Sequence, residues 1–256
     1  MADRFADLSD RYNALDGNLG QIVRRGLISR QLEHHLAPSS GIVDVGGGAG
    51  QQSIPLARKG HHVTILDPSP KMLAEARRRL EPEDEGTRRR MRLVEGAGEN
   101  LPAILGTETF DAALCHGVVM YLDDPRPMIR SLAAAVRPGG FVSVLAKNAA
   151  ALAFRPALKG DYKEALELLD ADRAAGRLGV VTRADTVEGL SETFEEAGLI
   201  VKSWYGVRVF TDHVGDRPPG DDLPDVLELE WEAGRRDPYR SVARMIHIVG
   251  RRRQNP

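Results

Sequence analysis

The sequence has a single cysteine, Cys115, which excludes an intrachain disulfide framework and is typical of a reducing compartment. No stretch approaches the roughly 20 apolar residues of a membrane span. The first residues, MADRFADLSDRYN, lack the apolar segment of a signal peptide. Basic residues are not in excess, since the chain has 35 Lys and Arg against 37 Asp and Glu. The chain therefore shows no global basic excess of the nucleic-acid-binding kind, and a local basic face stays open. We therefore expect a cytoplasmic protein without membrane contact.

After residue 40, short apolar segments alternate with segments of helical spacing. Strands are predicted at 41–45, 62–66, 91–94, 111–115, 141–146, 200–210 and 244–250. This alternation predicts an α/β fold, with a doubly wound, Rossmann-like, mainly parallel seven-stranded sheet and helices on both faces. The segment RPGG, residues 137–140, is expected to end a helix and to turn into the fifth strand.

We expect one domain over residues 1–256, because no linker divides the chain. Residues 41–146 are predicted to form its ligand-binding core. Residues 1–40 are predicted to be an N-terminal helical cover, and 147–185 and 211–240 to be insertions on the substrate side, the first of them helical.

The most informative segment is IVDVGGGAG, which has four glycines within residues 46–50, directly after the first predicted strand. A loop in this place lies at the carboxyl ends of the strands, where open α/β sheets bind ligands. A dinucleotide fingerprint, G-x-G-x-x-G, does not fit, because Gln51 or Ser53 occupies the third glycine position. The phosphate-binding P-loop also fails, since no Gly-Lys-Ser/Thr follows.

Two acidic residues indicate the ligand. Asp44, two residues before the glycines, would repel a pyrophosphate but attract a ligand carrying an ammonium and a sulfonium. Asp67 ends the second predicted strand, where it can accept hydrogen bonds from both hydroxyls of a ribose. Together they predict S-adenosylmethionine. The alternatives are a bare tight turn at the glycines and an N-cap role for Asp67.

The segments DVGGGAG, LDPSP, GAGENLP, FDAALCHGVVMYLDDP and RPGG together resemble the class I S-adenosylmethionine-dependent methyltransferases over residues 41–146. This resemblance implies that Gly98 and Glu99 lie beside the adenine and that His116 lines the methionine side of the pocket. Asn100 stands where the family commonly has Asp.

A narrower resemblance extends over most of the chain, through GNLGQIVRR, RPGGFVSVLAKNAAAL, GDYKEAL, EEAGLIVKSWYGVRVFTDH and LELEWEAGRRDPYRSVARMIHIVG. These segments are similar to the tRNA 5-carboxymethoxyuridine methyltransferases, which esterify the carboxylate of a modified wobble uridine. The resemblance implies that Arg24 binds the methionine carboxylate, with Gly46 and Gly47 beside it and Asp67 on the ribose. A solvated position for Arg24, with Arg25 as its rival, stays open.

The chain departs from that family at residues 174–186, AAGRLGVVTRADT, where a strongly basic run is replaced by scattered arginines. The triplets at 88–90 and 251–253 are alternatives for a basic rim, together with Arg208, Arg240 and Arg244, although such runs are commonly solvated surface. tRNA is therefore one candidate partner and a small molecule is the other.

No catalytic residue can be assigned from the sequence, and His116 and Tyr121 are the candidates. A carboxylate acceptor needs no general base, only a cation to hold it, for which Arg208 and Arg244 are candidates. A hydroxyl acceptor would need a base such as His116 or His213. The adjacent histidines at 34–35 and 61–62 diverge on a helix, so no metal site is expected.

The leading hypothesis is methyl transfer from S-adenosylmethionine to an oxygen, with the carboxylate of 5-carboxymethoxyuridine in tRNA as the candidate acceptor. The alternative enzyme is a carboxyl or hydroxyl O-methyltransferase for small molecules. The alternative of another class, a non-catalytic interaction module, predicts a damaged loop, yet Asp44, the glycines and Asp67 are all intact. The oligomeric state cannot be inferred.

Overall fold

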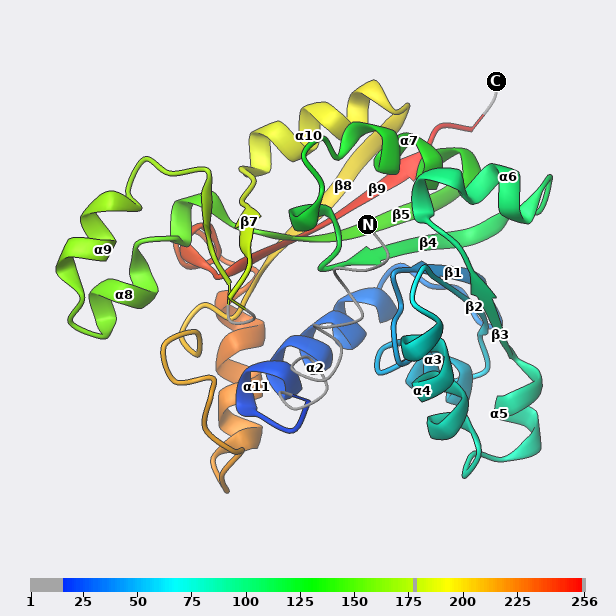
Figure 1. Ribbon diagram of the computed structural model, residues 1–256, viewed down its shortest axis with the longest axis horizontal. Coiled ribbons are helices and arrows are strands. Elements are labelled where there is room, and N and C mark those ends of the chain that lie inside the picture. Colours follow the sequence, from blue (N-terminus) through cyan, green and yellow to red (C-terminus); the bar gives the residue numbers. More distant parts are fainter. Residues whose placement is uncertain (1–15, 177–178, 255–256) are drawn as a thin grey trace.

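The computed structural model describes residues 16–176 and 179–254; the helical prediction for residues 1–15 lies outside them. Its main sheet has seven strands in the order β3-β2-β1-β4-β5-β9-β8 (Figure 1). Their bounds are β1 Gly41–Val45, β2 His62–Asp67, β3 Met91–Glu95, β4 Phe110–His116, β5 Val136–Lys147, β8 Leu199–Val207 and β9 Met245–Arg252. Only β9 is antiparallel to its two neighbours within this sheet. The predicted fold class is confirmed.

Helices cover both faces of the sheet (Figure 1). One face carries α2 Leu19–Glu33, α3 Ser53–Arg58, α4 Pro70–Leu80 and α11 Leu223–Ala233. The other carries α6 Leu101–Leu105, α7 Arg126–Ala135 and α10 Val187–Glu196, while α5 Glu85–Arg89 precedes the edge strand β3. Short 3-10 helices are η1 Gly98–Asn100, η2 Val119–Tyr121, η3 Ala149–Ala151 and η4 Tyr239–Val242. Among the described residues, no helix is long and apolar enough to cross a membrane.

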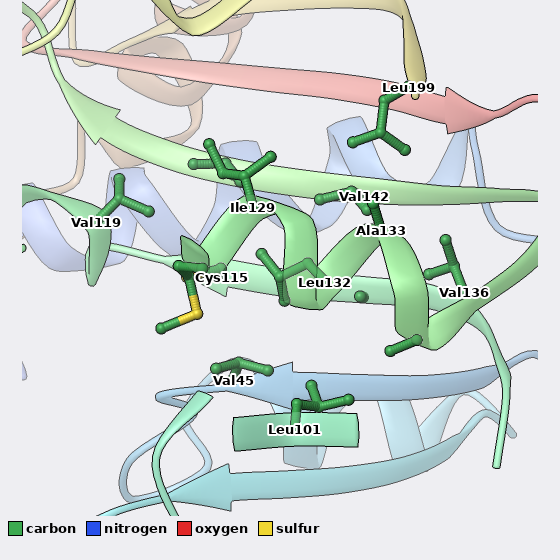
Figure 2. Close-up of a cluster of buried hydrophobic side chains, with 14 of the residues drawn as sticks. Val45, Leu101, Cys115, Val119, Ile129, Leu132, Ala133, Val136, Val142 and Leu199 are labelled. Atoms are coloured by element: carbon green, nitrogen blue, oxygen red, sulfur yellow. The ribbon is translucent and has the colours of Figure 1, made fainter. Parts of the chain in front are cut away.

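The largest apolar cluster fills the space between the sheet and the α7–α10 face (Figure 2). Cys115 lies inside it, between Val45 and Ile129, and is completely buried. Burial raises the pKa of its thiol, so that this side chain packs as a small apolar group. A second cluster joins α2 and α11 to the opposite face. The sheet is therefore buried on both sides, which fixes the ends of its strands as the place for a ligand.

The two larger differences from the predicted strand boundaries lie in β5 and β8, whereas the other five strands agree with the prediction to within two residues. RPGG lies within the long strand β5, where Gly139 has φ +79° and the pairing register with β4 shifts between Phe110 and Ala112. The glycines thus make an irregular part of a strand instead of a separate turn. β8 ends at Val207 and not at residue 210, because Arg208 has φ +64° and leaves the extended conformation.

The insertion over residues 147–185 is only partly helical. It contains α8 Phe154–Leu158 and α9 Tyr162–Glu167, followed by a two-stranded sheet of β6 Arg173–Ala175 and β7 Val181–Arg183. Lys147, at the end of β5, donates hydrogen bonds from Nζ to the carbonyl of Ala174 (2.6 Å) and to Oγ1 of Thr182 (3.0 Å). This buried ammonium ties the small sheet to the carboxyl end of the main one.

Candidate functional site

The glycine loop leaves β1 in a conformation that side chains disfavour. Gly46, Gly48 and Gly50 have φ values of +70°, +56° and +78°. The amide of Gly46 donates to the carbonyl of Leu66 (2.7 Å), which ties the loop to the end of β2. A Cβ atom on Gly46 would overlap Cγ2 of Val118. The glycines are thus required by backbone conformation and by close approach.

Asp44 lies beneath this loop and is 2% exposed. Its Oδ2 accepts a hydrogen bond from the Ser53 hydroxyl (2.5 Å), and a Cβ on Gly47 would lie 2.9 Å from the same oxygen. Burial raises the pKa of Asp44 to about 6, and the charge of Asp67 adds to this, whereas the Ser53 hydrogen bond and the charge of Arg24 act in the opposite direction. Asp44 therefore changes its charge close to neutral pH.

Asp67, at the end of β2, contacts the glycine loop from the side opposite to Asp44. Its two carboxylate oxygens accept hydrogen bonds from the amides of Gly48 and Ser69, each at 2.9 Å. Burial raises its pKa. The N-cap alternative is wrong, because Ser69 caps α4 by accepting from the amide of Met72 (3.3 Å). An ionised carboxylate accepts about four hydrogen bonds, so Asp67 retains capacity for a ribose.

Arg24 crosses from α2 to the end of β4. Its Nη2 donates to the carbonyl of His116 (3.2 Å) and its Nη1 to Oε1 of Gln21 (3.3 Å). The solvated alternative is therefore wrong. The rival, Arg25, is engaged by Asp16, whose carbonyl accepts from its Nη2 (2.8 Å) and whose carboxylate pairs with its Nη1.

One pocket is lined by the residues that the sequence predicted to contact the methionine part of the ligand; we call it the methionine-side pocket. Its lining includes Arg24, Asp44, Gly46, Gly47, Gln52 and His116, and it encloses about 400 Å³, part of it open to solvent. The pocket combines a guanidinium, a buried carboxyl and bare loop backbone. In addition, Nδ1 of His116 is buried with no hydrogen-bond partner among the described residues. This donor and acceptor set fits a zwitterionic amino-acid group such as the methionine part of S-adenosylmethionine.

The predicted adenine residues lie outside the lining of this pocket. Gly98 is buried in η1, where a Cβ would overlap Val45 and where its carbonyl accepts from the Ser131 hydroxyl (2.8 Å). Glu99 follows it and is half-buried. Tyr121, at the end of η2, is also half-buried and does not line the pocket. The contact of these residues with a ligand stays a prediction.

Burial and the charge of Arg24 lower the pKa of His116 to about 3. An imidazole of such low basicity is a poor general base at neutral pH. His116 is therefore better suited to accept a hydrogen bond than to remove a proton from a hydroxyl acceptor.

A second pocket, of about 270 Å³, contains the predicted acceptor residues. Arg208 pairs with Asp212 at 3.0 Å, and Arg244 and Arg155 approach the same carboxylate at 3.8 and 3.9 Å. The three guanidinium side chains are only 7%, 15% and 20% exposed. His213 lines the same pocket. We call Arg155, Arg208 and Arg244 the arginine pocket.

Sequence reasoning missed Arg155. It lies in the short segment AFRPAL, among apolar residues of the insertion, and only the fold brings it to residues more than 50 positions away. An arginine within an apolar segment is a signal, since arginine is rarely buried without a partner. The signal does not identify that partner.

The backbone around Arg208 is held by Glu230 of α11, which is completely buried. The Glu230 carboxylate accepts from the amides of Val209 (2.6 Å), Phe210 (3.0 Å) and Thr211 (2.8 Å). Arg208 is therefore held in place and buried, 6% exposed, and does not lie on the surface of an edge strand.

The arginine pocket also lies against α2. A Cβ on Gly20 would be 2.8 Å from Cζ of Arg208. Gly20 precedes Arg24 by four residues, which places both on one side of the helix. Helix α2 thus carries the methionine-side pocket and supports the arginine pocket one turn away.

The other arginines do not form the alternative basic rim. Residues 88–90 end α5 and lead into β3 at one edge of the sheet, whereas β9 lies beside the opposite edge strand. Arg251 and Arg252 donate to the carbonyls of Gly139 (2.8 Å) and Val136 (2.6 Å), at the start of β5. They therefore lie at the end of the sheet opposite to the glycine loop.

The adjacent histidines point to different partners. His34 stacks on Trp231, Nε2 of His35 lies 3.0 Å from the Tyr205 hydroxyl, and His61 accepts from a backbone amide. Among residues 16–176 and 179–254, no group of three or more His, Cys, Asp or Glu side chains is placed to hold a metal ion.

Comparisons with known proteins identify relatives of this chain. A family model described as a methyltransferase domain matches residues 43–144. The tRNA 5-carboxymethoxyuridine methyltransferase of Escherichia coli O157:H7 is 29% identical and is matched over 100% of this chain and 98% of its own. A ubiquinone biosynthesis O-methyltransferase of Xanthomonas campestris is 31% identical over 59% of this chain and 63% of its own.

Solved structures show the same fold. Magnesium protoporphyrin IX methyltransferase from Synechocystis, with bound S-adenosylhomocysteine, gives a TM-score of 0.62 at 15% identity, covering 95% of this chain and 93% of its own. A chain of the complex between the Haloferax volcanii Trm112 methyltransferase activator and a methyltransferase gives 0.64 at 18% identity, covering 100% and 98%.

The chain is a class I S-adenosylmethionine-dependent methyltransferase. Within that class it is similar to the tRNA 5-carboxymethoxyuridine methyltransferases over its full length and to the ubiquinone O-methyltransferases over part of it. When bound, S-adenosylmethionine supplies an activated methyl group on a sulfonium. The Asp44 carboxyl, the loop backbone and Arg24 are the residues that would hold its methionine part.

The raised pKa of Asp44 predicts how donor binding depends on pH. Only the ionised carboxylate attracts the ammonium and the sulfonium, so affinity should rise as pH rises through about 6. A group with this pKa is about one-tenth ionised at pH 5 and nine-tenths at pH 7, which gives about a tenfold tighter dissociation constant at pH 7. Titration calorimetry at both values measures it. Asp44→Asn should flatten the profile, and an unchanged slope in that variant would contradict the assignment.

Proposed function

We propose that this methyltransferase esterifies a carboxylate, and that its acceptor is 5-carboxymethoxyuridine in tRNA. The observation that carries the proposal is the arginine pocket, in which three largely buried guanidinium groups surround one carboxylate, that of Asp212. Arginine binds carboxylates through paired N–H donors, so such a pocket suits an acceptor carboxylate. The full-length similarity to the Escherichia coli enzyme supports the same acceptor.

The chemistry is consistent with the residues present. A carboxylate is anionic at neutral pH and can attack the methyl group without prior loss of a proton. The role of the arginine pocket would be to orient the acceptor and to leave one oxygen directed at the methyl group. The low basicity of His116 removes one of the two candidate bases that a hydroxyl acceptor would need, and His213 is the other.

The apolar part of the same pocket supports an acceptor with a planar ring. Phe154 and Leu158 of α8 line the pocket beside Arg155, although they are 45% and 61% exposed. Bases of single-stranded RNA commonly stack on exposed aromatic side chains while polar groups read their edges. A uracil ring on Phe154 would place a short 5-substituent among the guanidinium groups.

In this proposal the whole chain, 1–256, acts as one methyltransferase domain. Residues 41–146 bind the donor, the N-terminal helix covers it, and the insertions 147–185 and 211–240 provide the acceptor pocket. A tRNA acceptor would also place the enzyme in the cytoplasm. Contacts to tRNA phosphates would come mainly from individual exposed arginines, because no basic run is present at 174–186.

A small-molecule carboxylate is the second candidate acceptor. It is favoured by the charge distribution, because exposed arginines such as Arg30 and Arg217 are paired with Glu228 and Asp222, each at 2.7 Å. These pairs reduce the positive charge that phosphates could meet. The partial similarity to ubiquinone O-methyltransferases points in the same direction.

A methylation assay separates the two acceptors. The enzyme is incubated with isotopically labelled S-adenosylmethionine and either bulk tRNA containing 5-carboxymethoxyuridine, tRNA from cells that lack this nucleoside, or a set of small aromatic carboxylates. We expect label only in the first tRNA, as an ester that mild alkali releases. Labelling of small carboxylates, with neither tRNA labelled, would contradict the tRNA acceptor and support the second candidate.

A further inference from the structure

A chain of buried polar side chains runs behind the methionine-side pocket. Nε2 of His116 lies 2.9 Å from the Ser143 hydroxyl, which lies 2.6 Å from Nε2 of His247. Nδ1 of His247 lies 2.7 Å from Oε1 of Gln31. Ser143 and His247 are completely buried and Gln31 is 1% exposed. These hydrogen-bonded side chains come from the three neighbouring strands β4, β5 and β9 and from α2, the helix that carries Arg24.

The direction of the hydrogen bonds follows from Gln31. The Gln31 amide turns its carbonyl oxygen towards His247, and a carbonyl oxygen only accepts, so in this orientation Nδ1 of His247 carries the proton. Nε2 of a neutral His247 is then an acceptor, and it takes the hydroxyl proton of Ser143. The Ser143 oxygen in turn accepts from Nε2–H of His116, which leaves Nδ1 of His116 with a lone pair.

Both histidines are neutral. Burial lowers the pKa of His116 to about 3 and that of His247 well below its usual value, and each is lowered further by neighbouring groups such as Arg24 and His116 respectively. A second proton on His116 would lie on Nδ1, which has no partner among the described residues. Burial of both rings therefore favours the neutral state.

Within the part of the chain that the structure describes, Nδ1 of His116 is an unused acceptor in a residue that lines the donor pocket. The residue lines that pocket together with Arg24 and Asp44, and its Nδ1 is buried without a partner among the described residues. Its own backbone carbonyl accepts from Arg24, so the guanidinium lies beside this residue. A zwitterion placed here meets a cation for its carboxylate and a lone pair for its ammonium.

We propose that Ser143 and His247 are positioning residues for the methyl donor: with Gln31, they hold His116 in its Nε2–H form and so present Nδ1 to accept a hydrogen bond from the α-ammonium group of the donor. The opposite tautomer would direct an N–H at this ammonium. Ser143 and His247 thus act on donor binding without touching the donor.

The tautomer can be read directly in the unaltered protein. Nitrogen-15 chemical shifts of the His116 ring distinguish a protonated from an unprotonated nitrogen. We expect the proton on Nε2 and a lone pair on Nδ1 in the ligand-free enzyme. A proton on Nδ1 would overturn the proposal without any variant.

The affinities of a Ser143→Ala variant for two ligands distinguish a positioning role of Ser143 from a purely structural one. Ser143→Ala should weaken S-adenosylhomocysteine about tenfold, because a hydrogen bond to a charged group becomes misdirected. It should not change the affinity for 5′-methylthioadenosine, which lacks the amino-acid part. Ser143→Thr keeps the hydroxyl and should restore binding. Ser40→Ala is the matched control, since Ser40 is 3% exposed and its hydroxyl donates only to the carbonyl of Ala37.

Each outcome is decisive. If Ser143→Ala lowers the affinity for both ligands equally, the hydrogen-bonded side chains serve the packing of α2 on the sheet, and the proposal is overturned. Unchanged affinity for S-adenosylhomocysteine would overturn it as well. The acceptor does not enter any of these measurements, so the tRNA proposal can fail independently.

Discussion

Replacing Asp67 with alanine should weaken S-adenosylhomocysteine binding several hundredfold. The carboxylate is buried at the end of β2 and is expected to accept both ribose hydroxyls. Each hydrogen bond to a charged group contributes roughly 1.5–3 kcal/mol, so the loss of two costs about 3–4 kcal/mol at the lower end of that range. The variant also releases the amides of Gly48 and Ser69. Titration calorimetry measures the loss.

A second substitution and a second ligand show whether the lost affinity comes from the ribose contact or from the loop. Asp67→Asn keeps one oxygen and the shape of the side chain, so its loss should be closer to tenfold. A ligand that lacks the 2′ and 3′ hydroxyls should bind the wild-type enzyme and Asp67→Ala with nearly equal affinity. If Asp67→Ala lowers the affinity for that ligand as strongly as for the parent, Asp67 serves the loop conformation and not the ribose.

The second large effect is expected at Arg208. Arg208→Met keeps the apolar stem and removes the guanidinium from the pocket around Asp212. Loss of one cation from a buried carboxylate site typically costs about 2–5 kcal/mol, so kcat/KM for the acceptor should fall at least about 30-fold. The dissociation constant of S-adenosylhomocysteine should stay within about twofold, because Arg208 does not line the methionine-side pocket.

Arg126→Met is the control for a general effect of lost positive charge. Arg126 is 56% exposed at the start of α7, pairs with Asp124 and lines neither pocket. It should leave both kcat/KM and donor affinity unchanged. If Arg208→Met lowers donor affinity as strongly as Asp67→Ala, the assignment of Arg208 to the acceptor is wrong.

The donor side of the site was predictable because its signals are local. Asp44 and the glycines are contiguous, and each glycine with positive φ reports a backbone requirement that sequence reveals directly. Asp67 was predictable because the ends of parallel strands meet at one edge. The seven strands followed from apolar alternation, with the larger boundary errors where Gly139 and Arg208 take left-handed conformations; the short strands β6 and β7 were missed.

The acceptor pocket and the buried hydrogen-bonded side chains behind the donor pocket were less predictable from the sequence. Arg155 and Arg208 meet through an insertion and a loop whose paths no periodicity specifies. The contact of Ser143 with His116 and His247 depends on the pairing register of β5 with both β4 and β9. A strand pattern predicts that such residues are buried, but not which of them are neighbours across a sheet.

The left-handed backbone at Arg208 has a consequence for laboratory evolution. An L-residue with a side chain pays roughly 1–2 kcal/mol to adopt this conformation, and glycine does not. Glycine at position 208 would remove that cost, but it would also remove the guanidinium that pairs with the largely buried Asp212 carboxylate at 3.0 Å. Loss of one partner from a buried ion pair costs about 3–5 kcal/mol, which exceeds the gain in the backbone. The ion pair therefore holds position 208 in a conformation that glycine would adopt more readily, and a screen for heat resistance alone should retain arginine there.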